Sequence, residues 1–337
     1  MNKKLFGVLI VSLALLVSGV LPAFAETMTW KVVGLNRATP QFKPWEWFAA
    51  ELEKRTKGQI KVNLVSLPEL GLTGFELVRV IKAGLVDVAD ILPTYVAGDV
   101  PIIEGVDLVG LFPDFDTSVK AHDAFMPVLS KHLAKIAGGV VIGVYYWPHQ
   151  VMWSRKPVRS LNDLKGMKVR VYGTAQTEFL KALGAVPVSI AFAEVYTALE
   201  RGTVDAAITG TYSGYALKWY EVSKYQIEMN LGPVIGTLTV SKRTWDKLTP
   251  GLKATLNQLG KEFTERGTEV GRRTSQLGID ESAKKGIEYV NLGPKFLKGT
   301  RKAVINAVIP GWVRRAGPEA KPVFNQYIAP YAGYKIP

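Results

Sequence analysis

The sequence predicts an α/β fold with two lobes, each a mainly parallel sheet covered by helices. Short apolar runs typical of buried strands alternate with amphipathic helical stretches almost from the start of the chain. The alternation resumes after Pro157, and one helix–turn–strand pattern occurs twice. Strand, helix and strand in succession indicate parallel βαβ units, because two parallel neighbours need a long crossover between them.

The first half of the chain contains three expected strands and two expected helices. The strands are Thr29–Leu35, Ile60–Leu64 and Val86–Leu92, and the helices are Trp45–Arg55 and a segment that ends at Ala83. Thr73-Gly74-Phe75-Glu76 resembles a capping box and is expected to open the second helix, because Thr and Glu satisfy free backbone donors there.

The second half repeats this order. The strands are Met167–Tyr172, Val186–Ile190 and Val204–Thr209, and the helices between them are Thr174–Leu183 and Glu194–Arg201. The stretch from Glu76 to Ala89 is echoed 118 residues later: each copy has a helix that stops at Gly and a Val-Asp pair that opens a strand. The echo indicates two lobes of similar topology; chance likeness between ordinary turns is the alternative.

The C-terminal part begins with an expected strand at Val234–Ser241 and a turn. A helix from about Leu252 to Lys285, a strand at Ile287–Leu292 and helices from Pro294 follow. A helix of about 30 residues is about 45 Å long and could brace both lobes. No Ser/Gly/Pro linker separates the halves, so strand crossovers are the expected hinge. We predict lobe 1 from residues 26–147 with 236–275, and lobe 2 from 148–235 with 276–337.

Residues 1–25 have the pattern of a cleavable secretory signal. Lys3 and Lys4 supply a positive start, Leu5 to Val20 form an apolar run, and Ala23-Phe24-Ala25 matches the small-x-small pattern of a cleavage site. A membrane anchor is the alternative, but the run is marginal in length for a bilayer span. We expect export with cleavage after Ala25.

Composition and motifs exclude several functions. The chain has no cysteine, so disulfides, thiolate nucleophiles and Cys-ligated metals are impossible. The formal charge of +13, which becomes +11 without the two signal lysines, is dispersed among acids without a basic block, and this argues against nucleic acid as a partner. The three histidines lack metal-ligand spacing, and HExxH, GxSxG, Walker A and GxGxxG are absent. No metal, cofactor or catalysis is expected.

Arg170 is the residue that suggests a binding site. It lies inside an apolar strand, near the carboxyl end that faces the ligand crevice in an open α/β sheet. A buried arginine is costly without an anionic partner, and its planar fork suits a carboxylate. An edge-strand arginine with its head in water is the equal alternative.

Several motifs keep a fixed spacing along the chain. They are LNDLKGMKVR at 161–170, AFAEVYTALERGTVD at 191–205 and KWYEVSKY at 218–225, together with LVGLFP at 108–113 and Lys57-Gly58. These segments resemble the DLKG-x-K-x-R, AFSEVYTAL…G-x-VD, KFYEVQKY and LPFLFP patterns and the TnG turn of the solute-binding subunits of TRAP (tripartite ATP-independent periplasmic) transporters, the DctP family.

The resemblance implies a two-lobed, type II-like periplasmic-binding-protein fold with a long lobe-bridging helix. It implies closure on an organic anion, delivery to a two-part membrane permease, a periplasmic location and no enzyme activity, with a monomer as the default. Arg170 falls on the family's carboxylate-clamping arginine, and Phe192 on an aromatic that packs against the ligand. Asn36 matches a polar ligand contact, although a turn asparagine is an equal alternative.

The chain departs from many relatives at two places. Gln150 replaces a second arginine and Thr209 replaces an asparagine, while the surrounding sequence is aromatic and includes Trp147. Tyr95 and Tyr212 follow the two echoed strands and are expected at the crevice mouth, where a ring offers apolar surface and a hydroxyl.

We therefore hypothesise a monocarboxylate ligand with an apolar or aromatic body, including 2-oxo and 2-hydroxy acids. A dicarboxylate is the alternative, with Arg37 replacing the missing second cation. A periplasmic sensor subunit that presents its ligand to a receptor, the binding protein of an ATP-driven system and a two-lobed enzyme are the remaining alternatives.

Overall fold

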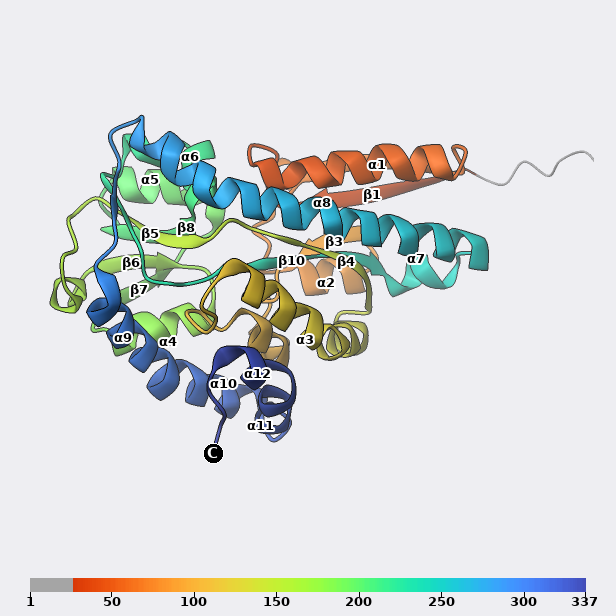
Figure 1. Ribbon diagram of the computed structural model, residues 1–337. Coiled ribbons are helices and arrows are strands. Elements are labelled where there is room, and N and C mark those ends of the chain that lie inside the picture. The colour runs from red at the N-terminus through yellow and green to blue at the C-terminus, as the bar shows by residue number, and fades with distance from the viewer. Residues whose placement is uncertain (1–26) are drawn as a thin grey trace, which may run out of the picture.

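Two separate β-sheets form the framework of residues 27–337, the part of the chain that the computed structural model describes (Figure 1). Sheet A has the order β2 (Ile60–Ser66), β1 (Met28–Gly34), β3 (Val88–Ile91), β10 (Ile235–Ser241) and β4 (Gly139–Tyr146). Sheet B has the order β11 (Glu288–Val290), β9 (Tyr225–Ile227), β5 (Gln150–Ser154), β8 (Ala206–Gly210), β6 (Lys168–Val171) and β7 (Val186–Ser189). The predicted signal segment, residues 1–25, lies outside the described residues.

Both sheets are mixed, and each contains one reversed strand. β10 runs antiparallel to β3 and β4, and β5 runs antiparallel to β8 and β9, whereas the other paired strands are parallel. Each reversed strand follows a direct crossover from the other sheet. The predicted α/β fold with two mainly parallel sheets is confirmed, with these two exceptions.

Helices cover both sheets. They are α1 (Lys43–Arg55), α2 (Leu77–Lys82), α3 (Phe115–Ile136), α4 (Thr174–Ala182), α5 (Val195–Glu200), α6 (Thr211–Ala216), α7 (Lys242–Asp246), α8 (Pro250–Ala283), α9 (Gly293–Ala303), α10 (Ile309–Ala316), α11 (Ala320–Val323) and α12 (Ala329–Ala332), with the 3-10 helices η3 (Pro101–Asp107) and η5 (Phe192–Glu194). The elements expected from the sequence all occur. Sequence patterns predict no range for β4, β5, β9, α3, α6 or α7. Gly143 and Gly214 interrupt the patterns of β4 and α6.

The sequence echo corresponds to equivalent turns in the two sheets. Gly84 and Gly202 both adopt left-handed conformations, with φ of 70° and 71°. The carboxylate of Asp87 accepts from the backbone N–H of Lys31, and that of Asp205 accepts from the N–H of Lys168, each at 2.9 Å. Each aspartate therefore joins the start of its strand to the adjacent parallel strand, and the two lobes share this unit.

Two crossovers, residues 147–149 and 228–234, connect the sheets directly. A hydrogen-bonded cluster ties them together: Glu228 in the second crossover binds Nε2 of His149 in the first at 2.9 Å and accepts from the Tyr289 hydroxyl at 2.5 Å. The backbone N–H of His149 donates to Ser275 of α8 at 2.9 Å. These contacts join the crossovers to the long helix.

Helix α8 spans both lobes, as the sequence predicted. It packs against β4 and α1 over sheet A and then against α6 over sheet B, and Figure 1 shows it running across the top of both. Glycines allow its close approach: a Cβ on Gly260 would lie 1.9 Å from the Ile142 carbonyl oxygen, and one on Gly278 would lie 2.1 Å from the Tyr212 nitrogen. The predicted bridging helix is confirmed.

The predicted residue boundaries of the lobes stay a prediction, and the C-terminal segment refines them. Residues 276–337 were assigned to lobe 2, but they divide: α9 packs on α4, whereas α10 and α12 pack on η3 and α3. The amphipathic α10 buries Trp312 against Gly105 of η3. We propose that residues from about 309 belong to lobe 1.

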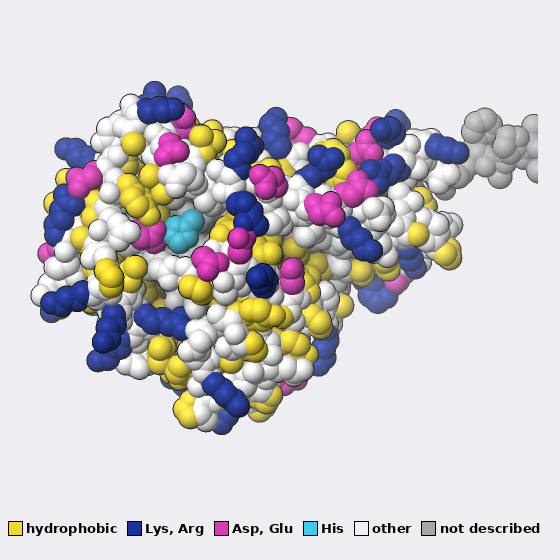
Figure 2. Space-filling view, viewed as in Figure 1, with side chains coloured by type: hydrophobic (Ala, Val, Ile, Leu, Met, Phe, Trp, Pro, Cys, Tyr) yellow, Lys and Arg dark blue, Asp and Glu magenta, His cyan; other side chains and the backbone are white. Residues whose placement is uncertain are grey.

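The surface carries mixed charges. Figure 2 shows Lys and Arg dispersed over the visible face and interleaved with Asp and Glu. Within residues 27–337, no helix combines the length and the apolar character that crossing a bilayer requires.

The close contact of α8 with β4 gives a testable prediction. Gly260→Ala should lower the free energy of unfolding by about 1–3 kcal/mol, because the added methyl meets backbone that cannot move aside. Gly251→Ala in the first turn of the same helix is the control: the nearest atom to its new Cβ is 4.0 Å away, so stability should be unchanged or increase by up to about 1 kcal/mol. Urea unfolding measures both; equal effects would contradict this packing.

Candidate functional site

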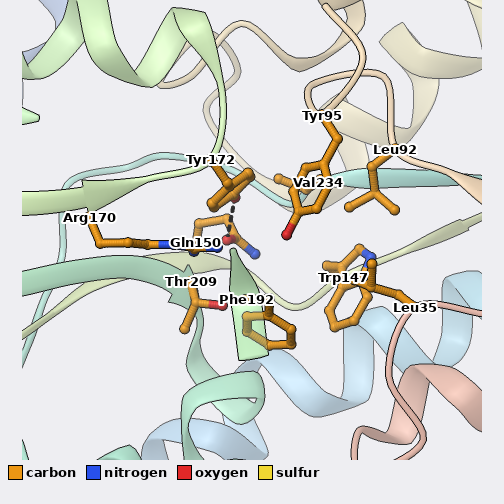
Figure 3. Close-up of a pocket in the computed structure, with 10 residues that line it drawn as sticks. All are labelled: Leu35, Leu92, Tyr95, Trp147, Gln150, Arg170, Tyr172, Phe192, Thr209 and Val234. Atoms are coloured by element: carbon orange, nitrogen blue, oxygen red, sulfur yellow. Dashed lines mark hydrogen bonds between the residues drawn. The ribbon is translucent and has the colours of Figure 1, made fainter. Parts of the chain in front are cut away.

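A small cavity lies between the two sheets, at the carboxyl ends of the parallel strands of both. Its lining residues lie near or after the ends of β1, β3, β4, β6, β7 and β8, at the start of the reversed strand β5, or just before the reversed strand β10. They are Leu35, Leu92, Tyr95, Trp147, Gln150, Arg170, Tyr172, Phe192, Thr209 and Val234 (Figure 3). The crevice thus forms at the carboxyl ends of the parallel strands, as expected for open α/β sheets.

Arg170 is fully buried at one end of this cavity. Its Nε donates to the Ile190 carbonyl and its Nη1 to the Ile208 carbonyl, both at 2.9 Å, while Nη2 has no hydrogen-bond partner among residues 27–337. Burial lowers the pKa of its guanidinium, and no carboxylate of the described chain forms a salt bridge with it. A buried cation of this kind requires an anion for stability.

Aromatic rings surround the guanidinium. Its central carbon lies 4.7 Å from the ring centre of Tyr172 and 5.9 Å from that of Phe192. Trp147 meets Phe192 edge-on at 6.0 Å, and Tyr95 stacks on Phe75 at 4.8 Å. The hydroxyl of Tyr95 points into the cavity in Figure 3. The cavity therefore combines one cation with flat apolar surfaces.

Gln150 and Thr209 line the cavity together with Arg170. The Gln150 carboxamide is fixed by the protein: its Nε2 donates to the Pro148 carbonyl at 2.7 Å, and its Oε1 accepts from the Tyr172 hydroxyl at 2.8 Å (Figure 3). Because β5 is reversed, its first residue Gln150 pairs with Gly210 at the end of β8. Both side chains are buried and uncharged.

Asp90 supports the opposite wall from inside sheet A. Its Oδ2 accepts from the Tyr145 hydroxyl at 2.6 Å and from the Leu35 backbone N–H at 3.1 Å. The same Tyr145 oxygen accepts from Trp147 Nε1 at 3.0 Å. Burial raises the pKa of Asp90 to about 8. An uncharged carboxyl group thus holds two cavity residues, Leu35 and Trp147.

Three residues predicted for the site do not line this cavity. The Asn36 side chain accepts from the Ala38 N–H at 2.9 Å, so it forms the turn that was the alternative interpretation, at a neighbouring hollow beside Phe192. Arg37 is exposed and bound to Glu69 at 2.9 Å. Tyr212 lies on α6 beside Tyr215, because α6 starts directly after β8 and packs its backbone against α8.

Six predicted residues do line the cavity, and four others were missed. The predicted set is Tyr95, Trp147, Gln150, Arg170, Phe192 and Thr209, and the missed set is Leu35, Leu92, Tyr172 and Val234. Leu35 and Leu92 follow parallel strands, so their positions could have identified them. Val234 lies in the crossover formed by residues 228–234, and the sequence does not show that this segment passes from one sheet to the other. In the described part of the chain, no group of three His, Asp or Glu side chains is arranged to hold a metal ion.

These features define the class of protein. Two α/β lobes joined by strand crossovers enclose a small cavity, and among its described lining residues Arg170 alone is charged, which is typical of a solute-binding protein for a small anion. The chain belongs to the DctP family: the family model of bacterial extracellular solute-binding proteins, family 7, matches residues 33–309. The resemblance to TRAP solute-binding subunits is confirmed.

Individual relatives agree with this assignment. A solute-binding protein of Albidiferax ferrireducens is 30% identical over 261 residues, which cover 74% of this chain and 75% of the relative. The C4-dicarboxylate-binding periplasmic protein DctP of Rhodobacter capsulatus is 27% identical over 287 residues, covering 83% and 84%. The crystal structure of DctP7 of Bordetella pertussis, an extracytoplasmic solute receptor binding pyroglutamic acid, matches with a TM-score of 0.84 at 24% identity, covering 89% of this chain and 99% of its own.

The raised pKa of Asp90 gives a testable prediction. In the folded protein this carboxyl keeps its proton up to about pH 8, whereas an unfolded aspartate loses it near pH 4, so its contribution to stability falls as the pH rises between these values. Relative to Asp90→Asn, wild type should lose up to about 1.4 kcal/mol per pH unit between pH 5 and 7. Urea unfolding across this range measures the difference; a difference independent of pH would contradict a protonated Asp90.

Proposed function

We propose that this protein captures a small organic monocarboxylate between its lobes and delivers it to a TRAP-type membrane permease. The unpartnered, fully buried Nη2 of Arg170 carries the proposal. A ligand carboxylate would supply the missing anion and accept from that nitrogen. Family membership supports a receptor role and not catalysis.

One carboxylate is favoured over two because the cavity offers one cation. The resemblance to the family aligns Gln150 with a second arginine of many relatives, and both ends of its uncharged carboxamide already bond to the protein. Arg37, the alternative second cation, lies outside the cavity and binds Glu69. Relatives include both a C4-dicarboxylate-binding protein and a receptor for pyroglutamic acid, which has one carboxyl group, so the family leaves the number of carboxylates open and the support for one comes from the cavity.

The remaining lining favours an apolar or aromatic ligand body. Trp147, Phe192 and Tyr95 present rings to the cavity, and Leu35 and Leu92 add aliphatic surface from sheet A. The cavity is narrow, so we expect a small ligand.

Lobe closure is the proposed mechanism. Arg170 and Phe192 come from sheet B and its connections, whereas Leu35, Leu92 and Tyr95 come from sheet A, so a ligand that touches both favours the closed state. Closure removes water from the ion pair and strengthens it. We also propose export with cleavage after Ala25, a periplasmic location and a monomeric state, with no turnover of the ligand; the signal pattern and the family support the first two.

Arg170→Ala tests the proposed role of the guanidinium. The variant should fold but weaken ligand binding by roughly 10²- to 10³-fold, because the carboxylate would be buried without a cation. Arg37→Ala removes an equal charge outside the cavity and should leave affinity within about threefold. Ligand released from the purified protein, identified by mass spectrometry, is titrated by fluorescence, with Trp147 in the wall as a reporter. Unchanged binding by Arg170→Ala would refute the role.

Butanoate and succinate test the number of carboxylates on a common four-carbon chain. Butanoate should bind at least about tenfold more tightly at pH 7, because the second carboxylate of succinate would lose its hydration without meeting a cation. Isothermal titration measures both. Tighter binding of succinate would overturn the monocarboxylate proposal and leave the family assignment intact.

A further inference from the structure

A second, narrow cavity lies beside the first. We call it the annex. It is lined by Thr94, Val106, Asp107, Leu108, Val109, Phe112, Ser118, His122, Gln150, Gln176, Leu231, Gly232, Pro233 and Val234. Gln150 and Val234 line both cavities. Residues of α3 and η3 form one side, and Gln176 of α4 and Gln150 of β5 form the other, so the annex also lies between the lobes.

Two buried polar atoms of the annex have no partner among residues 27–337: Oδ2 of Asp107 and Nδ1 of His122. Asp107 is 8% exposed and its Oδ1 accepts from the Ile235 N–H at 3.3 Å, while His122 is 1% exposed and stacks on Tyr146 at 5.4 Å. The Ser118 hydroxyl, by contrast, donates to the Asp114 carbonyl at 2.9 Å, and Gln176 Oε1 accepts from the Tyr172 N–H at 3.1 Å.

The annex offers no cation, because no lysine or arginine lines it. Burial raises the pKa of Asp107 well above its usual range and lowers the pKa of His122 to about 3, so burial disfavours the charged form of both groups. A second carboxylate would find no cation here, whereas an uncharged donor and acceptor would complement both unpartnered atoms.

The annex lies one side chain away from the arginine. The Arg170 guanidinium lies 4.7 Å from the Tyr172 ring, the Tyr172 hydroxyl donates to Gln150, and Gln150 borders the annex. Figure 3 shows the Gln150 carboxamide at the centre of the cavity, between Arg170 and Tyr95. Gln150 and Val234 are therefore the residues that a ligand anchored at Arg170 would pass to reach the annex.

We infer that the annex is a second ligand subsite, which takes an uncharged hydrogen-bonding group of the bound carboxylate. Asp107 and His122 recognise this group, which is a hydroxyl, an amide or a lactam. The inference rests on the proposed function and refines it: the ligand has a carboxylate at one end, an apolar body against Trp147 and Phe192, and a neutral polar group at the other end.

Three pentanoates that differ at the last position test the subsite in wild-type protein. Pentanoate ends in a methyl group, 5-hydroxypentanoate in a hydroxyl and 5-aminopentanoate in an ammonium group. Isothermal titration should show that the hydroxyl compound binds about tenfold or more tightly than pentanoate, because it satisfies buried polar atoms. The ammonium compound should bind more weakly than both. Equal affinities, or tightest binding by 5-aminopentanoate, would overturn the inference.

Matched variants locate the effect. His122→Phe keeps the stacked ring but removes Nδ1, and should reduce the preference for 5-hydroxypentanoate to within about threefold; Asp107→Asn keeps a neutral hydrogen-bonding group and should retain it. His132→Phe, the same change on the same helix beside Glu319, should leave the preference unchanged. If His132→Phe also lost the preference for 5-hydroxypentanoate, the result with His122→Phe would reflect a change in the fold and would count against the subsite. Failure of wild type to bind any of the three would count against the proposed function itself, whereas binding without preference would refute only the subsite.

Discussion

The buried charge of Arg170 is the constraint on which the other features of the site depend. The arginine cannot turn toward water, because its Nε and Nη1 are held by carbonyls that follow β7 and lie in β8. A fully buried cation without an anion is unfavourable by several kcal/mol. In the function that we propose, a ligand carboxylate supplies this negative charge when the lobes close on it, so closure and binding are coupled.

The framework around the cavity joins the two lobes at several points. Helix α8 packs on both sheets, and Glu228 links the two crossovers through His149. On the far side, Glu104 of η3 accepts from the Ala175 N–H at the start of α4 at 2.7 Å, and Arg315 pairs with both Glu104 and Glu178. Ala175 lies three residues after Tyr172, so this contact lies close along the chain to the wall of the cavity.

Sequence patterns predict the framework and half of the site for a physical reason. The ends of parallel strands are readable from apolar runs, and Arg170, Thr209 and Tyr95 line the cavity because each lies at or just after such an end. Tyr212 occupies the equivalent position by sequence but not in space, because α6 turns its backbone toward α8. The direction of a side chain after a strand depends on what the next helix packs against.

Other parts of the site depend on contacts that no local pattern encodes. Arg37 is paired with Glu69 on a neighbouring loop, and this pairing, not its position after β1, keeps it out of the cavity. Asp107 and His122 belong to different elements, and their burial together depends on the packing of η3 on α3. A lone aspartate and a lone histidine in the sequence carry no such information.

A crystal structure of the protein with its bound ligand tests the central claim most directly. Our account predicts a carboxylate oxygen within about 3.2 Å of Arg170 Nη2, with both lobes in contact with the ligand. A ligand that places an uncharged group or its apolar body at Arg170, or a guanidinium paired with a carboxylate of the protein itself, would contradict it.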